Sequence, residues 1–408
     1  MKALAPTRDD GALFVTQYYR PEWIGSGPYC GDMAEWLTTH ELDVRVLTGR
    51  PHYPGDAIFA DYRSGDRDEE ILEGVSITRV PNRILNGGGA LRRMVTDAHF
   101  LVRSLMELAR GRIRRQRLVV SLCPSILTVI LGAIMTRRGG RHVAVIHDIE
   151  SGLAEGLGMV GGGFMLRCLR SVERLALNRT DLALVLSEHM RAQLRARKVH
   201  VPIEVLPIWI DTDAIYPTDR RAGQPTTIIY SGNFGKKQSL AQILDLASLL
   251  QTARPAIRIV LRGEGREAHA LMETALSLGL RNIEFRPLLP PARLNVALSE
   301  GDIHLVPQNP QAADYAVPSK IFAIMAAGRP FIATAEPGSL LWKMQEDTGA
   351  FLCVPPNDPT AFADAVLRLS EDQALCAELG ARGRAHVLAH HAKPKVLRDF
   401  MSAVRGSS

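Results

Sequence analysis

The chain has 408 residues, more than one ordinary core accommodates, so we expect two domains of roughly 100 to 200 residues each. Hydrophobic residues make up 46% and charged residues 23% of the sequence, which excludes a disordered or fibrous protein and indicates a globular enzyme. The net charge is +6, and the concentration of basic residues between Arg83 and Arg117 indicates an anionic partner. No aromatic and basic platform is present, so nucleic acid is excluded from the predicted partners.

The first half of the chain alternates short apolar runs with longer helical patterns. Five of the runs are predicted as buried strands: Ala12 to Val15, Val44 to Leu47, Leu118 to Leu122, Val143 to Ile146 and Leu182 to Leu186. Since parallel strands need crossover helices, this alternation predicts a parallel sheet covered on both faces, and we assign residues 1–210 to it. The apolar run from Val119 to Met135 is shorter than the roughly 20 residues of a membrane span, so we predict a strand followed by a helix.

The basic residues of the first half gather between Arg83 and Arg117. Apolar residues at Leu91, Met94, Phe100, Leu101 and Leu105 give the segment an amphipathic pattern. It is either a solvated helix face or a surface that contacts an anionic membrane leaflet. Nine arginines, against only two acids, lie in it: residues 83, 92, 93, 103, 110, 112, 114, 115 and 117.

A polar, turn-rich segment at residues 211–227 breaks the alternation and is predicted as an interdomain linker. Asp211 and Asp213 in it could be taken for a metal-binding Asp-X-Asp, but aspartate commonly caps turns, and we predict no metal site. The alternation then restarts and defines a second domain at residues 228–390, followed by a C-terminal helix at 391–408 that either stays there or crosses back to the first domain. Six strands are predicted in this half: Ile228 to Tyr230, Ile257 to Leu261, Ile283 to Phe285, Ile303 to Val306, Phe331 to Ala333 and Phe351 to Val354.

Three places that follow strands of the second half carry glycine or cationic residues next to a helical pattern. Glycines let the backbone approach an anion at a helix N-terminus, and lysine or arginine can neutralise a diphosphate. Solvated lysines in a turn, and an ion pair between Arg262 and an acid, are the alternative interpretations. The residues concerned are Gly232, Asn233 and Lys237, then Arg262, Gly263 and Glu264, then Pro318, Ser319 and Lys320.

One of these stretches, Val317 to Pro330, resembles the donor-binding helix of the family-4 retaining glycosyltransferases, with Pro-Ser-Lys followed by Met-Ala-Ala-Gly-Arg-Pro. The two glycine turns and Gly301 to Pro307 resemble that family's successive donor-side loops. The overall pattern is most similar to the colanic-acid-type exopolysaccharide branch, from about Leu13 to about Val387. In the first half, Gly25, Ser26 and Gly27 resemble the acceptor-side glycine loop, and His147-Asp148, followed by Gly156 to Met159, resemble the catalytic-loop region.

The resemblance implies a GT-B fold, which is an α/β architecture of two Rossmann-like doubly wound parallel-sheet domains facing an interdomain cleft. It also implies retaining transfer of a sugar from a UDP- or GDP-sugar to a lipid-linked saccharide in surface or exopolysaccharide biosynthesis, with no cofactor and no divalent metal. His147 and Asp148 are the implied catalytic residues. The implied donor-binding residues are Gly232, Asn233, Lys237, Arg262, Gly263, Glu264, Pro318, Ser319, Lys320 and Glu336, and Gly25, Ser26 and Gly27 form the implied acceptor-side loop.

The sequence departs from the family pattern inside the donor helix. Ala323 stands where the family often carries a Glu for the ribose hydroxyls, and Glu336 is either a substitute for it or a solvent-facing loop acid. The branch also usually has Asn where this chain has Ile208, between Pro207 and Trp209. Two alternative functions stay open. One is a UDP-sugar 2-epimerase, which needs several acid/base carboxylates that we do not identify in the sequence. The other is a catalytically silent sugar-nucleotide-binding protein.

The five cysteines are scattered without CxxC spacing, which indicates neither a disulfide framework nor zinc. The N-terminal residues lack the apolar stretch of a secretory signal. We therefore expect a cytoplasmic protein that is peripheral at the inner membrane, with the anionic inner leaflet contacted through Arg83–Arg117.

Overall fold

The structure is a computed structural model that describes residues 11–22, 25–52, 57–82, 84, 90–123, 125–149, 151–152, 163–219, 225–310 and 318–406. The chain divides into two compact units. Unit 1 comprises Met1–Leu206 with Leu397–Ser408, and unit 2 comprises Pro207–Val396.

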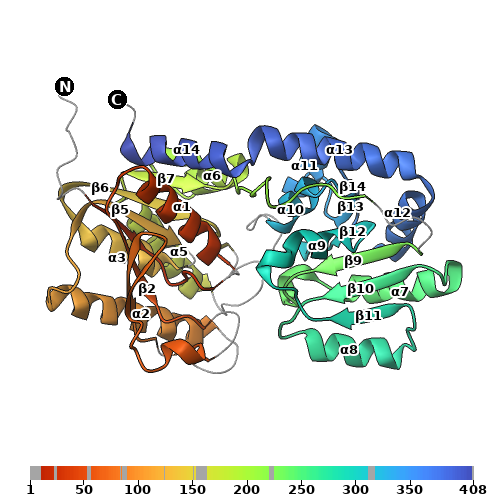
Figure 1. Cartoon of the computed structure of the whole chain (residues 1–408), viewed down its shortest axis with the longest axis horizontal. Coiled ribbons are helices and arrows are strands. Elements are labelled where there is room, and N and C mark those ends of the chain that lie inside the picture. Colours follow the sequence, from red (N-terminus) through yellow and green to blue (C-terminus); the bar gives the residue numbers. More distant parts are fainter. Residues whose placement is uncertain are drawn as a thin grey trace. The chain divides into compact units, whose positions relative to one another are not determined.

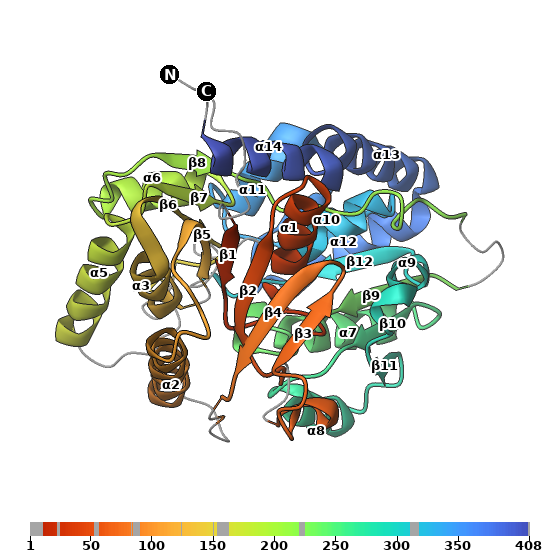
Figure 2. The same cartoon turned by 60° about the vertical axis from the view of Figure 1, so that its left-hand side comes forward.

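Unit 1 is built on a mixed sheet of order β3-β4-β2-β1-β5-β6-β7-β8 (Figure 2). Only the edge pair of β3 and β4 is antiparallel, and each other neighbouring pair is parallel. The order in which the strands are added to the sheet reverses between β1 and β5, because β2 lies on one side of β1 and β5 lies on the other. The strands are β1 (Ala12–Val15), β2 (Val44–Gly49), β3 (Glu69–Leu72), β4 (Val75–Val80), β5 (Gln116–Cys123), β6 (Thr136–Ile146), β7 (Leu182–Val185) and β8 (Ile203–Val205).

Strand β1 shows how this sheet is covered on both faces. Leu13 and Val15 belong to a buried cluster with Phe100 of one helix and Leu131 of another. Phe14 points to the opposite face, as alternation along a strand requires, and its ring lies 6.4 Å from that of Phe400 in the C-terminal helix. The helices are α1 (Gly27–Thr39), η1 (Ala60–Tyr62), α2 (Ala90–Ala109), α3 (Ile126–Met135), α5 (Gly163–Leu177), α6 (Glu188–Ala196) and α14 (Lys393–Arg405), within which the division between the units falls.

Unit 2 is built on a fully parallel sheet of order β11-β10-β9-β12-β13-β14 (Figure 1). Numbered within the unit, this order is 3-2-1-4-5-6, the strand order of a dinucleotide-binding Rossmann domain. The point where the strand order reverses lies between β9 and β12. The strands are β9 (Thr227–Ser231), β10 (Arg258–Arg262), β11 (Ile283–Arg286), β12 (Ile303–Val306), β13 (Phe331–Thr334) and β14 (Leu352–Val354).

The core of unit 2 joins the sheet to helices α7, α8 and α12 through fully buried residues such as Leu250 and Val366. The short helix α10 is buried along most of its length. Arg384 of α13 donates to the carbonyl of Ala326 at the end of α10, at 2.8 Å. The helices are η2 (Lys236–Gln238), α7 (Ala241–Ala253), α8 (Ala268–Ser277), η3 (Pro291–Arg293), α9 (Leu294–Ser299), α10 (Lys320–Ala326), α11 (Leu340–Thr348), α12 (Pro359–Glu371) and α13 (Gln373–His390).

Each of the strands predicted from apolar runs is present, and Val119 to Met135 forms a strand and a helix as predicted. The segment expected as a linker differs in its boundaries, because the division lies between Leu206 and Pro207 and the described residues up to 219 belong to unit 2. Arg384, for example, donates to the carbonyl of Thr212 at 3.0 Å. The C-terminal residues from Leu397 on belong to unit 1.

Candidate functional site

At the carboxyl ends of β9 and β10 in unit 2, two of the predicted donor-side loops are hydrogen-bonded to each other. Ligands of such sheets bind where the strand order reverses, and β9 borders that point. The amide of Gly232 donates to the carbonyl of Arg262 at 2.9 Å, and the amide of Phe234 donates to the carbonyl of Glu264 at 2.8 Å. The two loops that follow these strands are therefore held together by their backbones.

Gly263 is required by this close approach of two backbones. A Cβ added there would overlap the carbonyl oxygen of Gly232 and crowd the ring of Phe234. Because the glycines at these turns carry no side chain, the backbones of the two loops are able to approach a ligand at the strand ends.

We expect Gly263→Ala to destabilise unit 2 by about 2 kcal/mol or more, because the added methyl group forces the two loops apart. Gly279→Ala is the matched control: Gly279 has φ +64° and open space around its Cβ position, so only backbone strain of about 1 kcal/mol applies. Urea unfolding of both variants measures the difference. Equal losses would show that the loops do not depend on this contact.

Lys320, the first residue of α10, reaches the same glycine turn. Its Nζ lies 3.7 Å from the ring centroid of Tyr230, and a Cβ added at Gly232 would lie 2.9 Å from it. Nζ is buried and has no hydrogen-bond partner among the described residues. Burial lowers the pKa of this amine to about 7. A buried amine that lies over an aromatic face and has no hydrogen-bond partner in the described structure is a strong candidate for binding, in its protonated form, an anion that enters the site.

Tyr230 connects the amine to the glycine turn. The tyrosine is fully buried, and its hydroxyl donates to the carbonyl of Asn233 at 2.7 Å. Sequence reasoning assigned this residue no role beyond the strand that it ends. The one available signal was its place two residues before Gly232, where an alternating strand puts a side chain on the same side of the sheet.

The other predicted donor-side residues differ in exposure. Asn233, Glu264 and Ser319 have exposed side chains, Pro318 and Lys237 are half-buried, and the backbone carbonyl of Lys237 accepts from the amide of Asn309 at 2.8 Å. Glu336 is exposed in the turn after β13. Val317, at the start of the stretch that carries the family resemblance, lies outside the described residues.

Arg262 is engaged within unit 2. Its side chain is 4% exposed, pairs with the carboxylate of Glu300 and donates to the carbonyl of Pro287 at 2.8 Å. This is the ion-pair interpretation that the sequence left open. The guanidinium holds the end of β10 to the loop after β11.

His147 and Asp148 lie at the carboxyl end of β6 in unit 1. The imidazole is half-buried and stands edge-on to the ring of Tyr29 in α1, with ring centroids 5.5 Å apart. Burial lowers the pKa of His147 to about 4, although the charge of Asp148 acts in the opposite direction. The imidazole is therefore neutral at pH 7 and can donate or accept a hydrogen bond. It is not in the protonated, cationic form that acts as a general acid. Sequence reasoning did not pair His147 with Tyr29.

The glycine loop of unit 1 leads directly into α1. Gly25 has φ +74°, Ser26 precedes the first turn, and a Cβ at Gly27 would lie 2.8 Å from the carbonyl oxygen of Glu22. The hydroxyl of Ser26 is buried and has no hydrogen-bond partner in the part of the chain that the structure describes. Tyr29, in the first turn of α1, brings this loop next to His147 within unit 1. The predicted residues 156–159 lie outside the described ranges.

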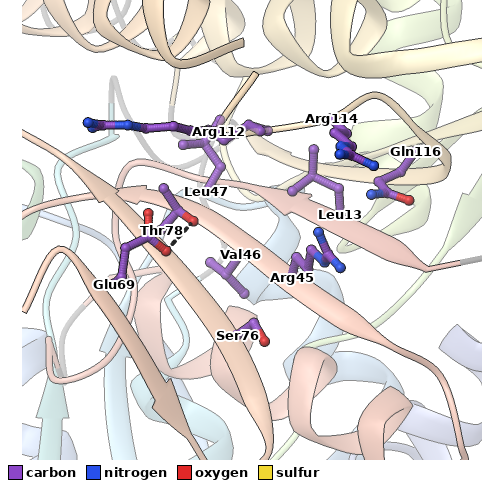
Figure 3. A pocket seen from close by; sticks show the side chains of 11 residues that line it. Leu13, Arg45, Val46, Leu47, Glu69, Ser76, Thr78, Arg112, Arg114 and Gln116 are labelled. Atoms are coloured by element: carbon purple, nitrogen blue, oxygen red, sulfur yellow. Dashed lines mark hydrogen bonds between the residues drawn. The ribbon is translucent and has the colours of Figure 1, made fainter. Parts of the chain in front are cut away.

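A cavity of about 220 Å³ lies elsewhere in unit 1, at the amino ends of the parallel strands. Figure 3 shows Arg112 and Arg114 along one side of it and Thr78 opposite, where the threonine hydroxyl donates to Glu69 at 3.0 Å. This cavity lies at the opposite end of the strands from His147.

The predicted absence of a metal site concerns Asp211 and Asp213 at the start of unit 2. Asp211 accepts from the amides of Asp213 and Ala214 at 3.1 and 3.0 Å, so it caps a turn. Within the described ranges, no cluster of three His, Cys, Asp or Glu side chains suits a metal ion. No helix in those ranges has the length and apolar character needed to cross a bilayer.

Two families match the chain, one in each half. The family described as Glycosyl transferase 4-like domain matches residues 25–209, and the family described as Glycosyl transferases group 1 matches residues 225–372. The colanic acid biosynthesis glycosyl transferase WcaI of Escherichia coli (strain K12) is 29% identical over 408 residues, covering 95% of this chain and 98% of the relative.

Solved structures resemble the whole chain in fold. The sucrose-phosphate synthase of Thermosynechococcus elongatus superposes with a TM-score of 0.75 at 18% identity, over 97% of this chain and 98% of that one. HepE of Anabaena, solved in complex with UDP and glucose, superposes with a TM-score of 0.70 at 14% identity, over 97% and 100% of the two chains.

Proposed function

Because the chain is a GT-B glycosyltransferase that joins a 4-like domain to a group 1 domain, we propose that it is a retaining enzyme using a UDP- or GDP-sugar. The acceptor in this proposal is a lipid-linked saccharide in surface or exopolysaccharide biosynthesis, as the name of the 29% identical WcaI suggests. The observation that carries the proposal is the buried amine of Lys320, which lies beside Gly232 without a hydrogen-bond partner in the described structure.

The donor's diphosphate suits the centre around Lys320. A departing nucleoside diphosphate develops negative charge, and a preformed cation in a water-poor site stabilises that charge strongly. The turns at Gly232 and Gly263 leave room for close backbone approach, and Ser319 offers a hydroxyl at the start of α10. Support for a nucleotide donor comes from HepE, which was solved with UDP and glucose.

The sugar being transferred is assigned to His147 in this proposal. A neutral imidazole can hydrogen-bond a sugar hydroxyl near the reacting carbon, and Asp148 can orient a second one. Gly25, Ser26 and Gly27 then supply backbone amides and the buried Ser26 hydroxyl. No divalent metal or other cofactor is part of this mechanism, because the lysine and the helix and loop amides serve the departing phosphate.

A lipid-linked acceptor brings the reaction to a membrane, so the proposal includes contact with an anionic inner leaflet through Arg83–Arg117. Of this segment the structure describes residue 84 and residues 90–117, the latter forming α2, the loop to β5 and the start of β5, whereas Arg83 lies outside the described residues. In that loop Arg112 is 68% exposed at the side chain. The protein acts in this proposal as a peripheral enzyme on the cytoplasmic side.

One experiment separates the proposal from its alternatives. The purified protein is incubated with a panel of nucleotide sugars, with and without lipid-linked saccharide, and both free nucleotide and altered sugar are measured. Acceptor-dependent release of UDP or GDP supports transfer, isomerised sugar would indicate a 2-epimerase, and tight binding without turnover would indicate a silent binding protein. The silent binding protein is kept as an alternative because Ala323, which is 9% exposed and apolar, offers the ribose no carboxylate.

Donor affinity is expected to fall as pH rises above about 7, by up to tenfold per pH unit. Lys320, with its pKa of about 7, binds a diphosphate in its protonated form, so binding takes up a proton once the amine is neutral. His304, whose pKa burial lowers to about 4, stays neutral throughout, as does Tyr230, whose pKa burial raises. Calorimetric titration of UDP between about pH 6 and about pH 9 measures the trend. A flat profile would contradict the assignment of this amine to the phosphates.

A further inference from the structure

The outward face of α2 is apolar. Phe100 is buried in the core of unit 1, and Leu101 and Leu105 are half-buried against that core, so these residues of the predicted amphipathic pattern face inward. Met94 of the same pattern faces outward and begins a second row of apolar side chains, because a helix presents positions four apart on one side. This row comprises Met94 at 53%, Val95 at 40%, Val102 at 48% and Met106 at 42% exposure.

Helix α5 has a second outward apolar row, which the sequence did not single out. Its inner side is held by buried Glu173, which accepts from the amide of Ser151 at 3.3 Å, and by Leu177. Its outer side carries Phe164 at 75%, Met165 at 52%, Val172 at 40% and Leu175 at 51% exposure. Large apolar side chains gathered in this way on two helices are unusual for a surface exposed only to water.

Helix α3 lies between these two helices and connects their faces. It packs against both α2 and α5, and the three helices lie along the same side of unit 1 in Figure 2. Helix α3 has no charged residue, and Leu127, Ile130 and Ile134 along it are half-buried. The outer side of this layer, which we call the α2–α3–α5 face, is therefore apolar across all three helices.

The charges on this face have one sign. The three acids of its helices are all buried: Asp97 accepts from Gln17 at 2.9 Å, Glu107 pairs with Arg110, and Glu173 pairs with Arg197. Arg167 is exposed, and Arg103, Arg170 and Arg174 are partly exposed. An apolar face that is edged by arginine and has no exposed acid on its three helices is complementary to an anionic lipid surface, with apolar side chains entering the acyl boundary and arginines meeting phosphates.

We infer that the α2–α3–α5 face docks on an anionic bilayer, with α5 inserting Phe164 and Met165 beside the row on α2. A second copy of the chain fits this face poorly, because it would bring arginine against arginine. The inference rests on the proposed function in one respect only, because the lipid-linked acceptor gives the enzyme a reason to meet a lipid surface. The face itself is independent of donor and acceptor. It extends the membrane contact beyond Arg83–Arg117 to a helix some fifty residues later in the chain.

The test is co-flotation of the full-length protein with vesicles of phosphatidylcholine, with and without phosphatidylglycerol, at low salt. We expect flotation only with phosphatidylglycerol, and about tenfold weaker binding for the double variant Phe164→Ser with Met165→Ser. The matched control is Leu276→Ser with Leu278→Ser, which removes two apolar side chains at 82% and 50% exposure from unit 2 and should leave flotation unchanged.

Two further readouts make the outcome decisive. Donor turnover with a detergent-dispersed acceptor should be the same in the α5 variant and the parent, so loss of vesicle binding is distinguished from failure of the proposed function. Light scattering after gel filtration reports the mass in solution. Unchanged flotation of the α5 variant overturns the inference, and a dimer that the same variant dissociates would instead assign the face to a second copy of the chain.

Discussion

Replacing Lys320 with Met is expected to lower kcat/KM for the nucleotide sugar by about 100-fold. The methionine keeps much of the length of the side chain over the ring of Tyr230 and removes only the cation, which lies 3.7 Å from the ring centroid in the parent. The same change should raise the thermal stability of unit 2, by about 2 °C or more, because a buried amine no longer has to be desolvated. Steady-state kinetics and a thermal melt on one preparation measure both effects.

Lys343→Met is the matched control, since Lys343 is an exposed lysine of α11 in the same unit. It removes the same charge from the unit and should leave turnover unchanged. Lower activity together with lower stability in the Lys320 variant would mean that the amine supports the fold. Unchanged kcat/KM with intact stability would remove Lys320 from the donor site.

Sequence reasoning missed β3, β4 and β8, and the exposed strand β3 shows one physical reason for a miss, although β4 is largely buried. Strands such as β1 and β12 are buried at each residue, and their apolar runs were recognised directly. The edge strand β3, with the sequence Glu-Glu-Ile-Leu, alternates exposed and half-buried residues, and Ile71 is 72% exposed. Nothing in such a short polar segment predicts a strand until β4 is there to pair with it.

The site divides in a similar way between local and distant contacts. The glycine turns and the start of α10 were recognisable because each is a contiguous motif with its own backbone requirement. The pairing of Arg262 with Glu300 joins residues 38 positions apart, and the stacking of Lys320 on Tyr230 spans ninety positions, so only the fold brings them together. Sequence reasoning therefore found which residues lie at the strand ends, but not which cation was already paired and which was left without a hydrogen bond.

The last prediction concerns His147, whose replacement by Ala is expected to lower kcat by about 100-fold or more while the fold is kept. The imidazole is half-buried at the carboxyl end of β6, and its ring contacts Tyr29 from one edge, so the substitution removes few packing contacts from the sheet. With a pKa of about 4 it is neutral during catalysis, and its contribution is a hydrogen bond that positions the sugar. The loss should accordingly stay constant between about pH 6 and about pH 8, without the slope that a titrating acid or base would give.

His142 on the same strand supplies the control that separates position from residue type. Its pKa is also lowered to about 4 by burial, but it lies inside β6 and not at its carboxyl end, is 1% exposed, and has Nε2 2.9 Å from the hydroxyl of Ser121. His142→Gln should therefore cost stability in a urea titration and leave kcat near that of the parent, the reverse of His147→Ala. If both variants lost stability and kept turnover, the carboxyl end of β6 would be only a wall of unit 1, and the sugar would have to be held from elsewhere.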